Sequence, residues 1–336
     1  MANTPTHLSP SKTVPVYRAD HFRAIYGANE GDGLSFAADL VLDDVYALSP
    51  QAQTVSLGLA RRGDAYVIAA GSQVGREGAQ IHLDCAATLM GYGTTVVELL
   101  VLVEVDRTGH ATDVYLLPLA PLTPKTEYRL VGTDIEGAAS KLAQVAAVSF
   151  TRGTQITLGC GRQRKVEDLR PGDEVLTRDD GIQRIRWIGH STQRAIGAFA
   201  PILIKAGTLN NINDLLVSPD HRLFVYQRTD RVGAGRAELL VKARHIVNGT
   251  TVTRQEGGFV EYFQLVFDTH QIIYAEGIAA ESMMVDDTTA SLVDGEVLAR
   301  LKKLPGSHRD ISELDVHQAL LNRPDAVEML RRASRG

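Results

Sequence analysis

The chain has 336 residues, of which 44% are hydrophobic and 22% charged, a profile typical of a soluble globular protein with room for two domains and a tail. Its formal net charge of -5 gives no electrostatic reason to expect a nucleic-acid or anionic-membrane partner. No apolar run approaches the roughly 18 residues that a membrane-spanning helix requires, so a helical membrane span is not expected.

Residues 1–15 are polar and rich in Thr, Ser and Pro, and they predict a flexible leader. They lack the basic start and the apolar core of a signal peptide. The cysteines, Cys85 and Cys160, fit neither a metal-ligand spacing nor a disulfide framework. We therefore expect a reducing cytoplasm, or export without a cleaved signal, and we expect no metal and no other cofactor.

Residues 16–148 are expected to form an antiparallel β domain, either a barrel or a sandwich. Short apolar runs alternate with clusters of Gly, Asp and Pro, which is the pattern of strands joined by turns. The runs are residues 55–59, 66–70, 81–83, 96–103, 114–119 and 128–131. Residues 107–110 predict a hairpin turn between two of them, and no motif of known chemistry is recognisable in this region.

Residues 134–144 predict a connector, and the small residues 145–148 that follow are expected to be extended. An extended segment of small residues suits a scissile peptide that must enter a cleft, although composition alone favours an ordinary interdomain strand. Residues 149–285 then predict a second β-rich domain with few helices. Its expected strands are residues 155–158, 174–177, 183–188, 201–204, 215–218, 222–226, 262–267 and 271–275.

Residues 286–336 change to helical spacing, with Leu, Val and Met recurring every three or four residues. The expected helices are residues 296–304, 313–321 and 326–332. Ser312 and Asp325 are suitable N-caps for the second and third of them. We expect this tail either to dock on the β-rich body or to bind a partner.

Three blocks in the second β-rich region carry a family resemblance. They are residues 148–154 around Ser149, residues 218–221, and residues 262–278. In this order and spacing they resemble the Hint fold, which Hedgehog autoprocessing domains and inteins share, and the chain is similar to bacterial Hint-domain proteins with an N-terminal β-rich domain. The resemblance covers residues 149–285 and implies an all-β, horseshoe-shaped autoprocessing domain.

The resemblance implies a self-processing reaction that begins with an N-to-O acyl shift, or an N-to-S shift where the nucleophile is cysteine. Ser149 would attack the carbonyl carbon of Val148 and convert the peptide bond into an ester. The family usually has cysteine here, and serine is a weaker nucleophile because its hydroxyl is almost wholly protonated near neutral pH. Serine is compatible with a slow natural variant, with a cysteine replacement that keeps the precursor intact, and with lost activity.

The resemblance also assigns the other candidate catalytic residues. His221 would be the general acid, because residues 218–221 resemble a Thr-x-x-His motif whose histidine hydrogen-bonds and protonates the scissile amide nitrogen. Ser218 occupies the Thr position and would polarise the same peptide. A plain turn followed by an incidental histidine explains the block equally well.

Asp268 and His270 belong to the third block. They alternate along a predicted strand and should therefore share one face. Either could orient His221 or activate water on the ester, and a solvent-exposed polar pair at a hairpin end is the competing interpretation.

An intein would end in His-Asn, whereas the corresponding residues here are Glu281 and Ser282. Without that asparagine no side-chain amide can cyclise, so splicing is not expected. The predicted outcome is release of residues 1–148, with the chain's own N-terminal domain as the substrate and water or an unknown nucleophile as the acceptor. The alternative is a catalytically silent Hint-derived scaffold whose tail and β domain bind partners.

Overall fold

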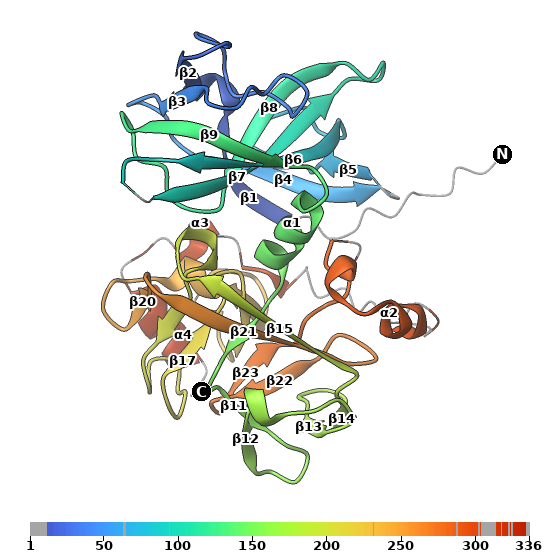
Figure 1. Cartoon of the computed structure of the whole chain (residues 1–336). Helices are drawn as coiled ribbons and strands as arrows, with labels where there is room; N and C mark the ends of the chain where they lie inside the picture. The colour runs from blue at the N-terminus through green and yellow to red at the C-terminus, as the bar shows by residue number, and fades with distance from the viewer. Residues whose placement is uncertain are drawn as a thin grey trace, which may run out of the picture. The chain divides into compact units, whose positions relative to one another are not determined.

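The computed structural model describes residues 12–62, 65–93, 95–230, 232–286, 288–301, 303, 314–316, 318–321, 323 and 325–333. The chain divides into two compact units between Leu142 and Ala143. Both units are mostly β, which confirms the predicted fold class (Figure 1). Within the described part of the chain, no helix combines the length and the apolar character that crossing a membrane demands.

The first unit is an antiparallel sheet that closes into a barrel. Its strands are β1 (Lys12–Arg18), β2 (Phe22–Tyr26), β3 (Val45–Leu48), β4 (Val55–Arg62), β5 (Ala65–Ile68), β6 (Gln80–Met90), β7 (Val96–Val105), β8 (Ala111–Pro118) and β9 (Glu127–Asp134), with a short 3-10 helix η1 (Ala19–His21). The sheet runs in the order β6-β5-β4-β1-β8-β7, and β7 pairs back onto β6. A barrel is therefore correct and a sandwich is not.

Strand β1 corrects the predicted leader. Lys12–Arg18 pairs with β4, and the side chains of Val14 and Val16 are buried in the core. The alternation of these two apolar residues is the signal of a half-buried strand, and it outweighs the polar composition around them. The expected leader is therefore wrong for residues 12–15, and residues 1–11 lie outside the described residues.

Helix α1 (Ala138–Ala146) corrects the predicted extended segment before Ser149. Val145 and Ala146 belong to its last turn, so residues 145 and 146 are not extended. The segment is rich in alanine, the strongest helix former, and its apolar positions fall on one buried face. The second unit begins within this helix at Ala143, and the chain leaves the helix at Ala147, shortly before strand β10.

The second unit follows from a series of short strands. They are β10 (Phe150–Thr151), β11 (Gln155–Thr157), β12 (Gln163–Lys165), β13 (Glu174–Leu176), β14 (Ile182–Arg184), β15 (Trp187–Arg194), β16 (Ile202–Ile204), β17 (Leu215–Val217), β18 (Arg222–Tyr226), β19 (Glu238–Lys242), β20 (Val252–Arg254), β21 (Phe259–Val266), β22 (Ile272–Ala275) and β23 (Ile278–Glu281). Short 3-10 helices are η2 (Val166–Asp168), η3 (Gly197–Phe199), η4 (Ala243–Ile246) and η5 (Ala290–Leu292).

Two larger sheets of the second unit frame its core. One runs β15-β21-β10-β17-β16-β20 and the other runs β12-β11-β22-β23-β18-β19, while β13 and β14 form a separate hairpin. Their facing apolar side chains make one core cluster. It includes Phe150 of β10, which is almost fully buried. Because β10 lies between β17 and β21, the residue just before β10 is flanked by both of those strands.

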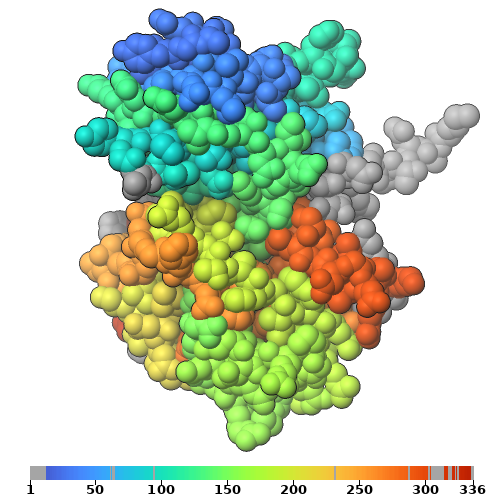
Figure 2. Space-filling view, viewed as in Figure 1, coloured from blue at the N-terminus to red at the C-terminus, as the bar shows by residue number. Residues whose placement is uncertain are grey.

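The C-terminal helices are α2 (Gly295–Leu301), α3 (Gln318–Leu321) and α4 (Ala326–Ala333). Helix α4 buries its apolar face in the core of the second unit, which confirms docking of the tail on the β body. Figure 2 shows the orange-red segment that contains η5 and α2 on the surface of this unit. The predicted N-cap Ser312 lies outside the described residues. The second expected helix, residues 313–321, is wrong for residues 314–316, because Asp315 forms a β-bridge with Leu240 and α3 covers only Gln318–Leu321.

Candidate functional site

Ser149 lies at the junction between helix α1 and strand β10. The register pairs its neighbour Phe150 with Val217 at the end of β17 on one side and with Phe263 in β21 on the other. Residues that follow Val217 and Phe263 are therefore placed beside Ser149. This strand pairing explains why segments so far apart in the sequence meet at one buried position.

The backbone and the side chain of Ser149 are both held by buried partners. Its amide nitrogen donates to Ser218 Oγ at 3.0 Å, and its carbonyl oxygen accepts from the Ser218 amide at 3.0 Å. Its hydroxyl accepts from Gln264 Nε2 at 2.7 Å and donates to the Ala147 carbonyl at 3.5 Å. Ser218 Oγ donates to the same Ala147 carbonyl at 3.4 Å. Hydrogen bonds therefore hold both Ser149, after the Val148–Ser149 peptide bond, and the Ala147 carbonyl, before it.

His221 reaches the same residue, but at a different atom from the one that the family resemblance implied. Its Nδ1 lies 3.1 Å from the Ser149 carbonyl oxygen, and the Ser149 amide nitrogen is bound by Ser218 instead. The expected contact of His221 with the scissile nitrogen is therefore wrong for this state. The carbonyl oxygen can only accept, so Nδ1 carries the proton in this arrangement.

The imidazole of His221 is enclosed. The side chain is fully buried, and its ring meets the Phe150 ring edge-on at 4.5 Å between centroids. Burial lowers the pKa of His221, while the Glu281 charge and the backbone of Ser149 and Glu281 oppose that shift. Nε2 has no hydrogen-bond partner among the described residues. Burial therefore favours the neutral form of the histidine.

Gln264 is a site residue that the sequence analysis did not identify. It sits within β21, where the side chains from Tyr262 to Val266 are all buried. A polar amide inside such an apolar strand needs a partner, because burying an unpaired amide is costly. The sequence therefore shows that Gln264 needs a hydrogen-bond partner, but it does not show which residue that partner is.

Asp268 and His270 do not share a strand face, which corrects the prediction made for them. Both lie in the connection between the end of β21 and the start of β22. Asp268 pairs with Arg186, whose Nε donates at 2.9 Å. His270 is buried, and its Nε2 lies 3.0 Å from the Ser282 carbonyl oxygen and 3.4 Å from Glu281 Oε2. Neither side chain hydrogen-bonds His221 or Ser149 in the described structure.

The residues at the expected intein C-terminus are buried and paired. The Gln271 amide donates to Ser282 Oγ at 2.9 Å, and the Ser282 amide donates to the Gln271 carbonyl at 2.8 Å. Glu281 is fully buried. The described residues contain no group of three or more His, Cys, Asp or Glu side chains placed to hold a metal ion.

An apolar cluster covers the residues before the Val148–Ser149 peptide bond, the expected cleavage site. Ala147 packs with Val266, Met283, Val293 and Leu301, and Val148 lies against the same cluster. Val293 and Leu301 come from the segment around α2, beyond the last strand. This segment therefore encloses the acyl side of the Val148–Ser149 peptide.

Comparison with known proteins shows what the region around the site is similar to. A family model described as a Hint domain matches residues 148–287. The match to a crystal structure of an Ssp DnaB mini-intein variant covers 42% of this chain and 97% of the intein chain, with 10% sequence identity and a TM-score of 0.28. The match to a crystal structure of the gp41-1 intein covers 40% of this chain and 97% of the intein chain, with 12% sequence identity and a TM-score of 0.25. No curated protein matches the chain.

Proposed function

We propose that the Hint domain of this chain, residues 148–287, cleaves its own polypeptide between Val148 and Ser149. The observation that carries the proposal is the set of contacts on Ser149. Its amide nitrogen and its hydroxyl are held by Ser218 and Gln264, and His221 is bonded to its carbonyl oxygen. Ser218 and His221, the residues of the Thr-x-x-His-like block, thereby meet the residue that occupies the nucleophile position of the family resemblance.

The first step is an N-to-O acyl shift. Ser149 Oγ forms a bond to the Val148 carbonyl carbon and loses its proton, the C–N bond breaks, and the freed nitrogen takes up a proton to become an amine, so one proton moves from oxygen to nitrogen overall. Gln264 Nε2 donates to the attacking oxygen, which holds that oxygen in place and favours the loss of its proton. The ester that results links the Val148 acyl group to the Ser149 side chain.

His221 supplies the proton for the leaving nitrogen. Its Nδ1 already contacts the carbonyl of the residue that carries this nitrogen, so a small rotation of the ring exchanges one target for the other. The protonated form of His221, which is the proton donor, becomes more abundant as the pH falls, and burial shifts this change to lower pH because it lowers the pKa of His221. Ser218 keeps the amide nitrogen oriented until that proton is transferred.

The second step releases residues 1–148. Water or another nucleophile attacks the ester at the Val148 carbonyl carbon, and Ser149 Oγ leaves with a proton. Splicing does not follow, because Ser282 has no side-chain amide and both its backbone and its hydroxyl are bound to Gln271. The substrate is the chain itself, and the products are the N-terminal β domain and the remainder.

A catalytically silent scaffold is the second candidate function, and one observation favours it. His221 bonds the Ser149 carbonyl rather than its nitrogen, and neither Val148 nor Ser149 has a cis peptide bond or a positive φ that would store strain. In that case the contacts at Ser149 only stabilise the fold.

The test compares the full chain with its Ser149→Cys variant, each incubated with a thiol and followed by intact mass spectrometry. We expect cleavage between Val148 and Ser149, faster in the cysteine variant because a thiol is a stronger nucleophile. His221→Ala should slow it, whereas His110→Ala, at an exposed hairpin residue, should not. Intact masses for both chains, with or without His221, would establish the scaffold instead.

A further inference from the structure

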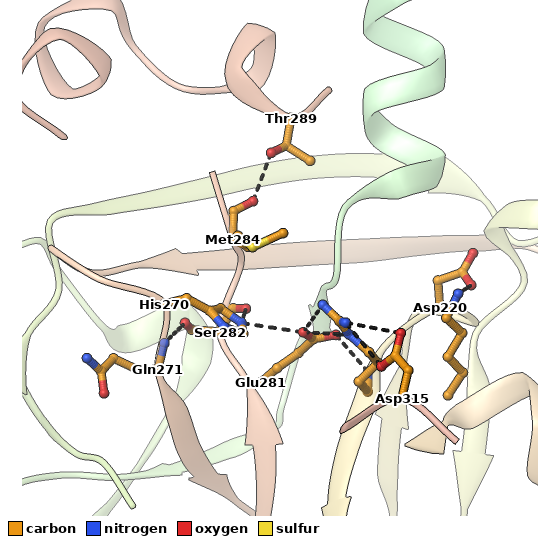
Figure 3. A network of polar contacts seen from close by, with 10 residues as sticks. Asp220, His270, Gln271, Glu281, Ser282, Met284, Thr289 and Asp315 are labelled. Atoms are coloured by element: carbon orange, nitrogen blue, oxygen red, sulfur yellow. Dashed lines mark hydrogen bonds and ion pairs between the residues drawn. The ribbon is translucent and has the colours of Figure 1, made fainter. Parts of the chain in front are cut away.

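A buried charge network begins at the residue that follows His221 in the chain. The next residue, Arg222, donates from Nε to Glu281 at 2.8 Å and 2.9 Å, and its Nη2 lies 2.8 Å from Glu281 Oε2. Its Nη1 donates to Asp315 Oδ1 at 3.1 Å. Figure 3 shows Glu281 between His270 and Asp315, with dashed contacts on both sides.

Glu281 is the fully buried member of this network. Burial by itself raises the pKa of its carboxyl, but the charge of Arg222 and the contact with His270 hold that pKa well below its usual range. The carboxylate also accepts the Arg222 backbone amide at 3.0 Å. Glu281 is therefore ionised at neutral pH, and its charge favours the protonated form of His221.

Asp315 enters the network from the C-terminal tail. The tail forms a parallel bridge between Asp315 and Leu240 in β19, and the Val316 amide donates to the Leu240 carbonyl at 2.9 Å. Val316 is buried in the core of the second unit. Asp315 is thus held by backbone and core contacts, although it lies outside residues 148–287 that the family model matches.

The charges that surround these groups come from several elements. Arg222 and Lys242 face Asp315 from β18 and β19, and Glu281 faces it from β23. His270 contacts Glu281 from the connection before β22. Asp220, the residue before His221 in the chain, pairs with Lys242 at 3.5 Å and with Arg244 at 3.2 Å.

The signs of these charges give Asp315 a role. Arg222 lowers the pKa of His221, and Glu281 raises it. The positive charge of Arg222 therefore weakens the effect of Glu281 on the imidazole. Burial raises the pKa of Asp315, while the charges of Arg222 and Lys242 act to lower it. In its ionised form this second carboxylate offsets Arg222 and leaves more of the charge of Glu281 to stabilise the imidazolium.

We infer that Asp315 is a positioning residue for the self-cleavage reaction, because its pairing with Arg222 lets Glu281 favour the proton-donating form of His221. The inference rests on the proposed function of the Hint domain. It also means that the C-terminal tail is part of the catalytic unit. A chain that ended at residue 287 would then have a different pH dependence.

The experiment uses the full chain with Asp315→Asn, and Asp325→Asn as the control, because Asp325 is an exposed aspartate of the same tail paired with Arg323. In the Ser149→Cys background, cleavage is measured from pH 5 to pH 8. We expect Asp315→Asn to slow cleavage about three- to tenfold at pH 7, since a lower histidine pKa leaves less imidazolium, and to converge with the control at acidic pH. Asp325→Asn should match the parent throughout.

A second readout separates this inference from the proposed function. The protonation of His221 is followed by NMR in the full chain with Ser149 unchanged, so it requires no cleavage. Half-protonation should need a more acidic pH in Asp315→Asn than in Asp325→Asn. An unchanged His221 titration, or an equal rate loss at every pH, would overturn the positioning role. Absent cleavage with a shifted titration would instead overturn only the proposed function.

Discussion

Replacing Gln264 with methionine removes the donor that faces the nucleophile and changes little else. Gln264 Nε2 donates to Ser149 Oγ at 2.7 Å, and both side chains are buried, so water cannot take its place. Methionine has a similar length and can fill the same space, but it has no N–H to donate. The hydroxyl would keep only its 3.5 Å contact with the Ala147 carbonyl.

The magnitude follows from the energy of one buried hydrogen bond. Such a bond contributes about 0.5–1.5 kcal/mol net, and its loss makes the reaction roughly two- to twelvefold slower if the bond strengthens by that amount on going from the intact chain to the transition state. The loss should be larger for serine than for the Ser149→Cys variant, because sulfur is the weaker acceptor. It should not depend on pH, since an amide does not titrate.

The assay follows the two fragments by intact mass spectrometry over time. Gln183→Met is the matched control, because Gln183 lies in β14 and donates only to the Asp180 carbonyl. Gln264→Met cleaving as fast as Gln183→Met would refute the idea that Gln264 acts on the nucleophile.

Three further predictions concern neighbouring residues. Gly189→Ala should slow cleavage about as much as Gln264→Met, because a β-carbon on Gly189 would overlap Gln264 Oε1 and displace the donor; the fragment assay measures this. Ser218→Ala should lower the free energy of unfolding by about 1–3 kcal/mol in urea titrations, since the scissile amide loses its acceptor in a buried site, and Ser218→Thr should restore it. Glu281→Gln should cost about 3–5 kcal/mol, because it leaves the Arg222 charge without its main partner. The pKa of Glu281 is lowered in the folded chain, so this stabilisation is present above the usual carboxyl pKa of about 4.3 and is lost as the pH falls below it; urea titrations at pH 7 and pH 3 test the sign.

Local sequence patterns predicted the β-rich architecture well where apolar and polar residues alternate or where apolar residues form a continuous run. The hairpin of β7 and β8 and most strands of the second unit were expected near their observed positions. The residues of α1 were misjudged because small residues suit both a helix and an extended cleavage segment, and only the burial of one helix face decides between them. The closure of the barrel depends on β7 pairing back to β6, which no local pattern encodes.

At the site, the sequence indicated the positions but not the contacts. Ser149, Ser218 and His221 were identified from motif spacing, and the structure brings them together. The atom that His221 contacts depends on the register of β10 against β17, which sequence cannot specify. Asp268 was assigned to a strand that ends before it, and it pairs with Arg186 instead.

The most direct test of the central claim is whether an ester forms at Ser149 in the unsubstituted chain. The purified protein is incubated with hydroxylamine and its fragments are weighed by mass spectrometry. Hydroxylamine captures an ester as a hydroxamate, so self-processing predicts an N-terminal fragment that ends in a hydroxamate at Val148. A chain that stays intact, or a fragment that ends there only as the free acid whatever the hydroxylamine concentration, would contradict the acyl shift.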